Sequence, residues 1–209
     1  MAESALKSQM TSLAKMPSAA SSAGYQANSG KSTDTGAKGS TAGAAISNEG
    51  VPLYNQKDNQ WKDRKLERVY TIGQFGCAVT STAMSLSKIS GEKINPEQMD
   101  QYLDDNHGYH NEMILWEIAA RKIGTTASMM RSIDNKETID RSLESGHPCV
   151  ISVNQKRHWV CVAGRNADGS YIIHDPEGGK MIGAKWDEKS RNILVDGYRA
   201  GTELRTFGI

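Results

Sequence analysis

Residues 73–90 read GQFGCAVTSTAMSLSKIS and contain a cysteine at the point where a turn becomes a helix. After this cysteine, apolar side chains recur at Val79, Ala83 and Leu86, which is the i, i+4, i+7 spacing of one helix face. Two glycines before it supply the flexible backbone that a turn requires. The stretch therefore predicts a helix that starts at Cys77 and runs to the end of the quoted segment.

The position of Cys77 gives its thiol an unusual environment. The unpaired N–H groups and the positive end of the dipole at a helix N-terminus favour the thiolate, which is the nucleophilic form of cysteine. A free cysteine is also among the most buried residue types and often packs as a small apolar side chain. Cys77 is therefore a candidate nucleophile if the sequence also supplies a base.

A candidate base and its partner lie on two predicted strands further along the chain. Residues 157–162 read RHWVCV, and residues 171–176 read YIIHDP after the turn-forming segment NADGS. His158 opens the first strand and Asp175 closes the second, so antiparallel pairing sets both at the same edge of the sheet. The imidazole can take the thiol proton and return it to a leaving group, while the carboxylate holds the other ring nitrogen. The alternative for Asp175 is an ordinary strand-ending turn before proline.

These segments resemble the papain-like cysteine peptidases of the bacteriocin-processing type, also called double-glycine leader peptidases, and their broader bacterial peptidase-like relatives. The resemblance covers about residues 51–185. Its motifs are VPLYNQ at 51–56, Asp58 with Trp61, TIG at 71–73, GC at 76–77 followed by TSTAM at 80–84, HWV at 158–160, and DP at 175–176. The resemblance implies a papain-like core, no cofactor, and a peptide or protein as the substrate.

The same resemblance assigns roles to individual residues. It makes Cys77 the nucleophile, His158 the general base and acid, and Asp175 the residue that orients the imidazole. An upstream glutamine completes the oxyanion hole in such enzymes, and Gln56 and Gln74 are the two candidates. We favour Gln56, whose side-chain amide would donate to the oxyanion together with the backbone N–H of the nucleophile. The alternative for Gln56 is a loop residue that bonds to nearby backbone.

Three residues beside this catalytic set are expected to contact the substrate. They are Gln74 and Gly76, which precede the nucleophile, and Trp159, which follows the base. Trp159 could also shield the hydrogen bond between His158 and Asp175 from water, although tryptophans more often serve as packing groups.

Composition argues against nucleic-acid and membrane binding. The 25 basic and 24 acidic side chains leave a net charge of +1, and the basic residues are scattered rather than clustered. No stretch approaches the roughly 18 apolar residues of a membrane span, and the N-terminus lacks the basic and apolar regions of a standard secretory signal. We expect no nucleic-acid partner, no membrane span, and a location in the cytoplasm of the producing cell or delivery from it without a standard signal.

The remaining cysteines and histidines are expected to be structural. The three cysteines are an odd number without a CxxC pair, and Cys149 and Cys161 lie in apolar runs typical of a core. The histidines at 107, 110, 147 and 174 lack the spacing of a metal site, so we expect no metal. His174 should point to the opposite side of its strand from Asp175.

Two regions of different composition divide the chain. Of the first 50 residues, 31 are Ala, Gly, Ser or Thr and one is aromatic, so residues 1–50 are expected to form a flexible tail or linker. Its role stays open between a delivery tail, a tether, a pro-segment and a passive tail. Residues 51–209 are long enough for one domain with its own core.

Within that domain the sequence predicts helices first and strands afterwards, which is the order of an α+β fold. We expect N-terminal helices packed on a C-terminal antiparallel sheet. The predicted helices cover residues 77–90, 96–104, 113–123 and 137–145, and the predicted strands cover residues 148–153, 158–163, 170–174 and 192–195. Loops expected over residues 104–111 and 177–186 would shape the substrate preference.

The sequence therefore predicts a thiol hydrolase that cleaves a peptide or isopeptide bond through an acyl-enzyme. A related interpretation keeps the same triad and makes the substrate a peptidoglycan stem peptide, attacked from a phage particle or by a delivered toxin. Two further alternatives are glutamine deamidation or transfer through the same intermediate, and a non-catalytic peptide-binding or virion-structural module. The sequence does not indicate an oligomeric state.

Overall fold

The computed structural model describes residues 44–130, 136–153, 157–188, 192–195 and 203–209. Its helices are α1 (Ile72–Phe75), α2 (Cys77–Ser90), α3 (Pro96–Asp105), α4 (Trp116–Arg121) and α5 (Lys136–Glu144). In the described part of the chain, no helix is both long and apolar enough to cross a membrane.

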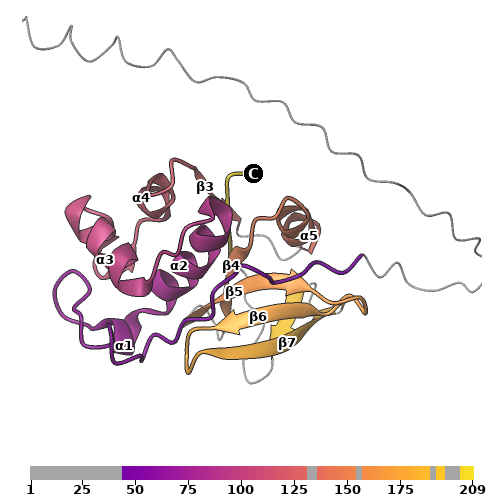
Figure 1. The fold of residues 1–209 in the computed structure, drawn as a ribbon, viewed down its shortest axis with the longest axis horizontal. Helices are drawn as coiled ribbons and strands as arrows, with labels where there is room; N and C mark the ends of the chain where they lie inside the picture. The colour runs from indigo at the N-terminus through magenta and orange to yellow at the C-terminus, as the bar shows by residue number, and fades with distance from the viewer. Residues whose placement is uncertain (1–43, 131–135, 154–156, 189–191, 196–202) are drawn as a thin grey trace, which may run out of the picture. The chain divides into compact units, whose positions relative to one another are not determined.

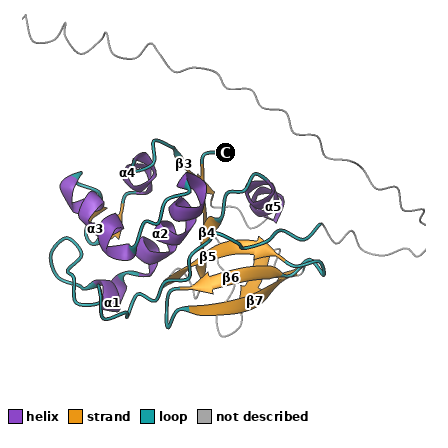
Figure 2. Ribbon diagram, viewed as in Figure 1, coloured by secondary structure: helices purple, strands orange, loops and turns teal. Residues whose placement is uncertain are grey.

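Among the described residues, one large sheet has seven strands in the order β3-β9-β4-β5-β6-β7-β8, and all neighbouring strands are antiparallel. Figure 2 shows β5, β6 and β7 of this sheet side by side. These strands are β3 (Ala127–Met130), β4 (Cys149–Val153), β5 (His158–Arg165), β6 (Tyr171–Asp175), β7 (Lys180–Asp187), β8 (Asn192–Val195) and β9 (Leu204–Phe207). A separate hairpin pairs β1 (Tyr109–His110) with β2 (Met113–Ile114). Because most helices precede the sheet in the chain, the predicted α+β class is confirmed.

The sheet has helices on both of its faces. On β4, Val150 belongs to the apolar cluster of α2, α3 and α4, whereas its neighbours Cys149 and Ile151 belong to a second cluster with α5. Side chains of consecutive strand residues point to opposite faces, so α2 and α5 cover opposite sides of this strand. Figure 1 shows α1 to α4 grouped together and α5 apart from them, near the strands.

Helix α2 begins and ends where the sequence predicts. It ends at Gly91, whose φ of 75° lies in the left-handed region that suits glycine. Two buried serines connect the helix to the sheet, because Ser81 Oγ donates to the Trp159 carbonyl (3.0 Å) and Ser85 Oγ donates to the Pro148 carbonyl (2.6 Å). These bonds fix the helix relative to β4 and β5.

The helix predicted over residues 113–123 is only partly correct. Its first two residues instead form β2, and α4 starts at Trp116. The hairpin turn holds Glu112 at a φ of 64°, where its N–H donates to the Glu67 carboxylate (2.9 Å) and its own carboxylate accepts from the Val69 N–H (2.8 Å). Contacts with a loop distant in sequence therefore outweigh the local helical pattern.

Of the seven strands of the large sheet in the described residues, β4, β5, β6 and β8 fall on predicted strands, and β3, β7 and β9 do not. Strand β7 occupies most of the segment expected as a loop over residues 177–186. Ala184 is its one fully buried residue, so the strand lacks the apolar alternation by which a strand is recognised. Backbone pairing with β6 and β8 forms this strand without an apolar signal.

A segment before the domain boundary expected at residue 50 packs against the sheet. Within residues 44–56, which we call the strap, Ile46 exchanges two backbone hydrogen bonds with Arg165 (2.7 and 2.9 Å). A Cβ at Gly164 would lie 2.6 Å from the Ile46 carbonyl oxygen, so this crossing requires glycine. The flexible tail stays a prediction, because residues 1–43 lie outside the described part.

Candidate active site

Cys77 is the first residue of α2, and Gly76 is its N-cap. The N–H of a first helical residue has no partner within the helix, so it is available to a ligand. A Cβ at Gly76 would lie 2.5 Å from the Ile72 carbonyl oxygen, which already accepts the Gly76 N–H at 2.8 Å. Glycine therefore permits the close approach of α1 to α2, and the Cys77 side chain stays partly exposed.

His158 and Asp175 lie together at the edge where β5 begins and β6 ends. The His158 Nε2 and the Asp175 Oδ1 are 2.7 Å apart, and the two residues are only 6% and 1% exposed. The same carboxylate oxygen accepts the Glu177 N–H at 2.9 Å. The carboxylate is therefore fixed from two directions and holds the imidazole in one orientation.

The Cys77 thiol is the second partner of the imidazole. It lies within hydrogen-bonding reach of His158. Because Asp175 engages Nε2, the ring nitrogen left for the sulfur is Nδ1. The structure thus brings together three residues from α2, β5 and β6 that the sequence analysis selected.

This environment favours the charged form of His158. Burial lowers the pKa of His158, but the hydrogen bonds to Asp175 and Cys77, and the negative charges of these two partners, raise it more, to about 9. At neutral pH the ring is therefore an imidazolium, which can protonate a leaving amine.

Gln56 lies at the end of the strap and is only 5% exposed. Its backbone N–H donates to the Pro176 carbonyl (2.9 Å), and its side-chain Nε2 donates to the Gly73 carbonyl (3.2 Å). The second hydrogen of Nε2 is available for another acceptor. The buried Gln56 Oε1 has no hydrogen-bond partner among the described residues, which is uncommon in native proteins outside functional sites.

Gln74, the other candidate donor, is used within α1. Its side-chain carbonyl accepts the Thr71 N–H at 3.0 Å and so completes a capping box at the start of this short helix. The side chain of Gln74 still lines the polar side of the site, whereas Gly76 is not among the lining residues there.

Two pockets meet at Cys77. The larger one, of about 650 Å³, is mostly apolar, and we call it the apolar pocket. Its apolar walls are Phe75, Ala78, Val79, Met113, Ile114, Leu115, Trp116, Met129 and Trp159. The smaller one, of about 440 Å³, is the polar pocket, which contains Gln56, Lys57, Gln74, Arg157, His158 and Glu177. A ligand long enough to occupy both pockets would therefore pass over the Cys77 thiol, with one end in the apolar pocket and the other in the polar pocket.

Trp159, which was expected to contact substrate, forms part of the apolar pocket. Its ring centroid lies 4.8 Å from that of Trp116, and the Arg205 guanidinium lies 5.0 Å from both rings. Arg205 also pairs with Glu203 at 2.8 Å. Trp116 and Arg205 were not selected from the sequence, because they come from α4 and β9, and no local pattern links them to Cys77.

The other cysteines and histidines show no catalytic arrangement among the described residues. Cys149 and Cys161 are fully buried, as expected, and burial raises the pKa of both thiols. No group of three His, Cys, Asp or Glu side chains in the described ranges could hold a metal ion.

Comparison with known proteins identifies one family. The family model described as "Peptidase_C39 like family" matches residues 48–199, which include all four of the residues selected as catalytic. None of the curated proteins matches the chain.

Proposed function

This chain belongs to the Peptidase_C39 like family, a group of papain-like cysteine peptidases, and from this membership we propose that it hydrolyses a peptide or isopeptide bond through an acyl-enzyme on Cys77. In this proposal the papain-like catalytic domain comprises residues 51–209, with the nucleophile on α2 and the base on the sheet. The strap completes the site by supplying Gln56.

One observation carries the proposal. A partly exposed cysteine at a helix N-terminus faces a buried imidazole, and a buried carboxylate holds the other ring nitrogen of that imidazole at 2.7 Å. This is the geometry of a nucleophile, a base and an orienting group. A purely structural role would not require a charged histidine beside a partly exposed thiol.

The reaction follows from these contacts. The Cys77 sulfur attacks the scissile carbonyl carbon, while the thiol proton resides on His158. The oxyanion that forms would accept hydrogen bonds from the Cys77 N–H and the Gln56 Nε2. His158 then gives its proton to the leaving amine, and the C–N bond breaks. Water, deprotonated by His158, then attacks the thioester carbonyl. The C–S bond breaks, which releases the carboxylic acid product and frees the Cys77 sulfur.

The two pockets suggest how a substrate lies. The leaving amine must depart beside His158, which belongs to the polar pocket. The acyl side of the substrate would then extend into the apolar pocket, where Met113 and Met129 are 59% and 54% exposed. A large apolar side chain fits this surface, because its burial removes apolar area from water. This favours a peptide or protein substrate over a peptidoglycan stem peptide, whose side chains are small or charged.

A peptide library tests the proposal. The wild type and Cys77→Ala are incubated with a mixture of peptides that differ in the residues on both sides of each bond, and mass spectrometry identifies the products. We expect backbone cleavage after or near large apolar residues in the wild type and none in the variant. Equal product patterns in the two samples, or a gain of about one dalton at glutamine without cleavage, would contradict hydrolysis of a peptide bond by Cys77.

A further inference from the structure

The strap reaches the active site through a series of hydrogen bonds to the sheet. It starts beside β5, where Arg165 Nη2 donates to the Ala44 carbonyl (3.1 Å), and ends where the Gln56 N–H donates to the Pro176 carbonyl (2.9 Å). Among the 13 residues between and including these ends, only Val51 and Gln56 are buried. Ile46, Val51 and Tyr54 also make apolar contacts with the core, so the position of Gln56 depends on specific bonds as well as on apolar packing.

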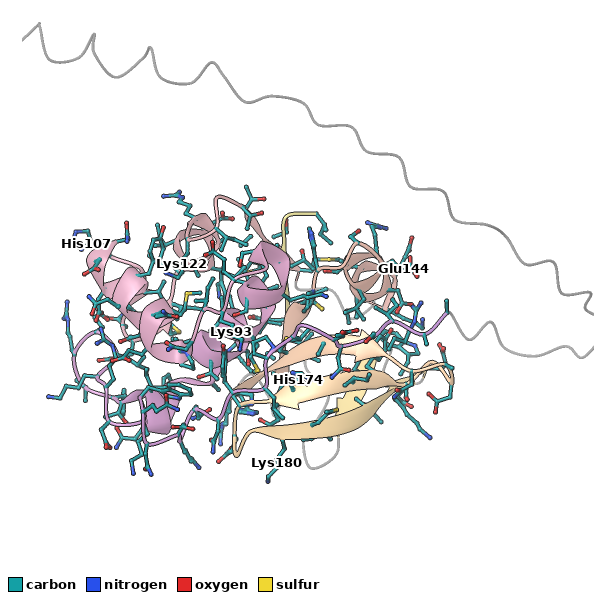
Figure 3. All side chains as sticks on the ribbon, in the orientation of Figure 1. Lys93, His107, Lys122, Glu144, His174 and Lys180 are labelled. Atoms are coloured by element: carbon teal, nitrogen blue, oxygen red, sulfur yellow. The ribbon has the colours of Figure 1, made fainter. Side chains whose placement is uncertain are left out.

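His174 makes the central bonds of this series. Its side chain lies on β6 beside the strap (Figure 3), and the residue is only 2% exposed. The His174 Nδ1 is 3.1 Å from the Pro52 carbonyl oxygen, and the Nε2 is 3.0 Å from the Asn48 Nδ2. Both ring nitrogens thus contact the strap.

The chemistry of the two partners fixes the state of the ring. A carbonyl only accepts, so Nδ1 carries the proton, and an amide NH₂ only donates, so Nε2 accepts. This pattern needs a neutral imidazole. Burial lowers the pKa of His174, although the bond to Pro52 raises it, and the ring therefore stays neutral near pH 7.

His174 is also next to the catalytic set in sequence. Consecutive residues of a strand face opposite sides, so His174 faces the strap while Asp175 faces His158, as the sequence predicts. Pro176 then holds the backbone of Gln56. Three consecutive residues therefore connect the orienting carboxylate of the triad with the segment that carries the oxyanion donor.

We propose that His174 is a positioning residue for the oxyanion hole, which holds the strap at Asn48 and Pro52 so that the Gln56 amide stays at the Cys77 thiol. This inference rests on the proposed function, because it concerns the reaction of Cys77 with a carbonyl. It assigns to His174 an effect on carbonyl chemistry and none on the reactivity of the sulfur itself.

Two reagents separate these effects. With p-nitrophenyl acetate, the Cys77 sulfur attacks the acetyl carbonyl, a thioester forms through an oxyanion, and p-nitrophenolate leaves. With iodoacetamide, the sulfur displaces iodide directly and no oxyanion forms. The ratio of the two rates at Cys77 therefore reports on the oxyanion hole. Cys77→Ala supplies the background for both reactions.

Two substitutions of His174 make the test specific. His174→Leu fills a similar volume but removes both bonds, and we expect the ratio of acylation to alkylation to fall by about tenfold, because a displaced group can cost up to about 10² in rate. His174→Gln retains one donor and one acceptor and should restore the ratio to within about twofold of the wild type. Ser47→Ala, an exposed change in the same strap, is the control and should not alter the ratio.

If His174→Leu does not fold, Asn48→Ala is the second variant. It removes the bond between Asn48 and His174 but keeps the bond to Pro52, and the ratio should fall by a few fold. A ratio unchanged in both variants, or an equal loss in both reactions, would overturn the role of His174 while leaving the proposed function intact. A wild type that shows no acylation above the Cys77→Ala background would instead remove the proposed function, and this inference with it.

Discussion

Helix α2 and the strap approach the same site from two sides, and they are held there differently. Residues 79–87 of α2 are all buried, and its serines bond to the sheet from inside the core. The strap buries two of its residues and depends on bonds to Arg165, His174 and Pro176. Changes on the α2 side should therefore lower stability, whereas changes on the strap should lower the rate of the proposed reaction first.

The largest expected effect is a loss of kcat, and it should distinguish Gln56 on the strap from Gln74 on α1. Gln56→Ala should lower kcat by about 10²-fold or more, which is the usual effect of losing one oxyanion donor, while the midpoint of thermal unfolding changes little. Gln74→Ala removes the capping box of α1 and should cost about 1 kcal/mol of stability, with a kcat within a few fold of the wild type. Steady-state kinetics on the best peptide from the library measures both. A larger kcat loss in Gln74→Ala would move the oxyanion donor from the strap to α1.

The next effect is a loss of activity at alkaline pH. The pKa of His158 is raised to about 9, so the folded protein holds this proton below pH 9 and loses it as the pH rises through that value. Activity that needs the imidazolium should decline above about pH 9, by about tenfold per pH unit. The stability that this charge contributes is complete below about pH 6.5, the ordinary pKa of histidine, and is lost between there and pH 9.

Asp175→Asn is the matched variant for this pH profile. It retains a hydrogen-bond acceptor for the His158 Nε2 but removes the negative charge, so the alkaline inflection should move to lower pH. The profile of kcat/KM against pH checks this expectation. An inflection that does not move would mean that a group other than His158 controls the alkaline limb.

A smaller effect is expected when a glycine is replaced at either end of α2, and it can be measured as a change in stability and in the alkylation rate of Cys77. Gly76→Ala places a Cβ 2.5 Å from the Ile72 carbonyl oxygen, so the backbone must shift, at a cost of about 1–3 kcal/mol. Because Cys77 is the next residue, its alkylation by iodoacetamide should also slow. Gly91→Ala adds a side chain in open space at a φ of 75°, which costs about 1–2 kcal/mol but should leave that alkylation rate unchanged. Equal alkylation rates in the two variants would contradict a role for the α1–α2 contact in placing the thiol.

The smallest effect is expected where α2 and the strap touch at the surface. Lys88 Nζ donates to the Glu49 carbonyl at 2.7 Å, and this bond is exposed to solvent. Lys88→Ala should change the free energy of unfolding by no more than about 0.5 kcal/mol and should leave kcat unaltered. A tenfold loss of kcat would show that the strap depends on α2 rather than on His174 and Pro176.

Helix α2 and the pair formed by His158 and Asp175 could be predicted from the sequence because their signals are local. The apolar spacing from Val79 to Leu86 defines α2, and Gly91 ends it. The apolar runs of β5 and β6, with a turn between them, also place His158 and Asp175 at one edge. Each of these inferences uses residues that are close in sequence.

The path of the strap and the apolar pocket could not be predicted in this way, although the family resemblance selected Gln56 at the end of the strap. Residues 44–50 lie in a region rich in small residues, and the strap bonds to the sheet through its backbone and through the pair formed by Asn48 and His174, which are 126 positions apart. The residues that line the apolar pocket include Trp116, Met129 and Arg205, which lie on three separate elements. Long-range pairing of β3 with β9 brings the last two together, and no local pattern encodes it.

The most direct measurement is the rate of iodoacetamide alkylation at each of the three cysteines, followed by mass spectrometry in the wild type and in His158→Ala. At pH 6 an ordinary free thiol, with a pKa of about 8.5, is almost entirely protonated and reacts slowly. We expect selective and rapid labelling of Cys77 at this pH, no labelling of the buried Cys149 and Cys161, and at least a tenfold slower reaction of Cys77 in the variant. Slow labelling of Cys77 that does not depend on His158 would contradict an activated Cys77–His158 pair and leave a binding or structural module as the function of this fold.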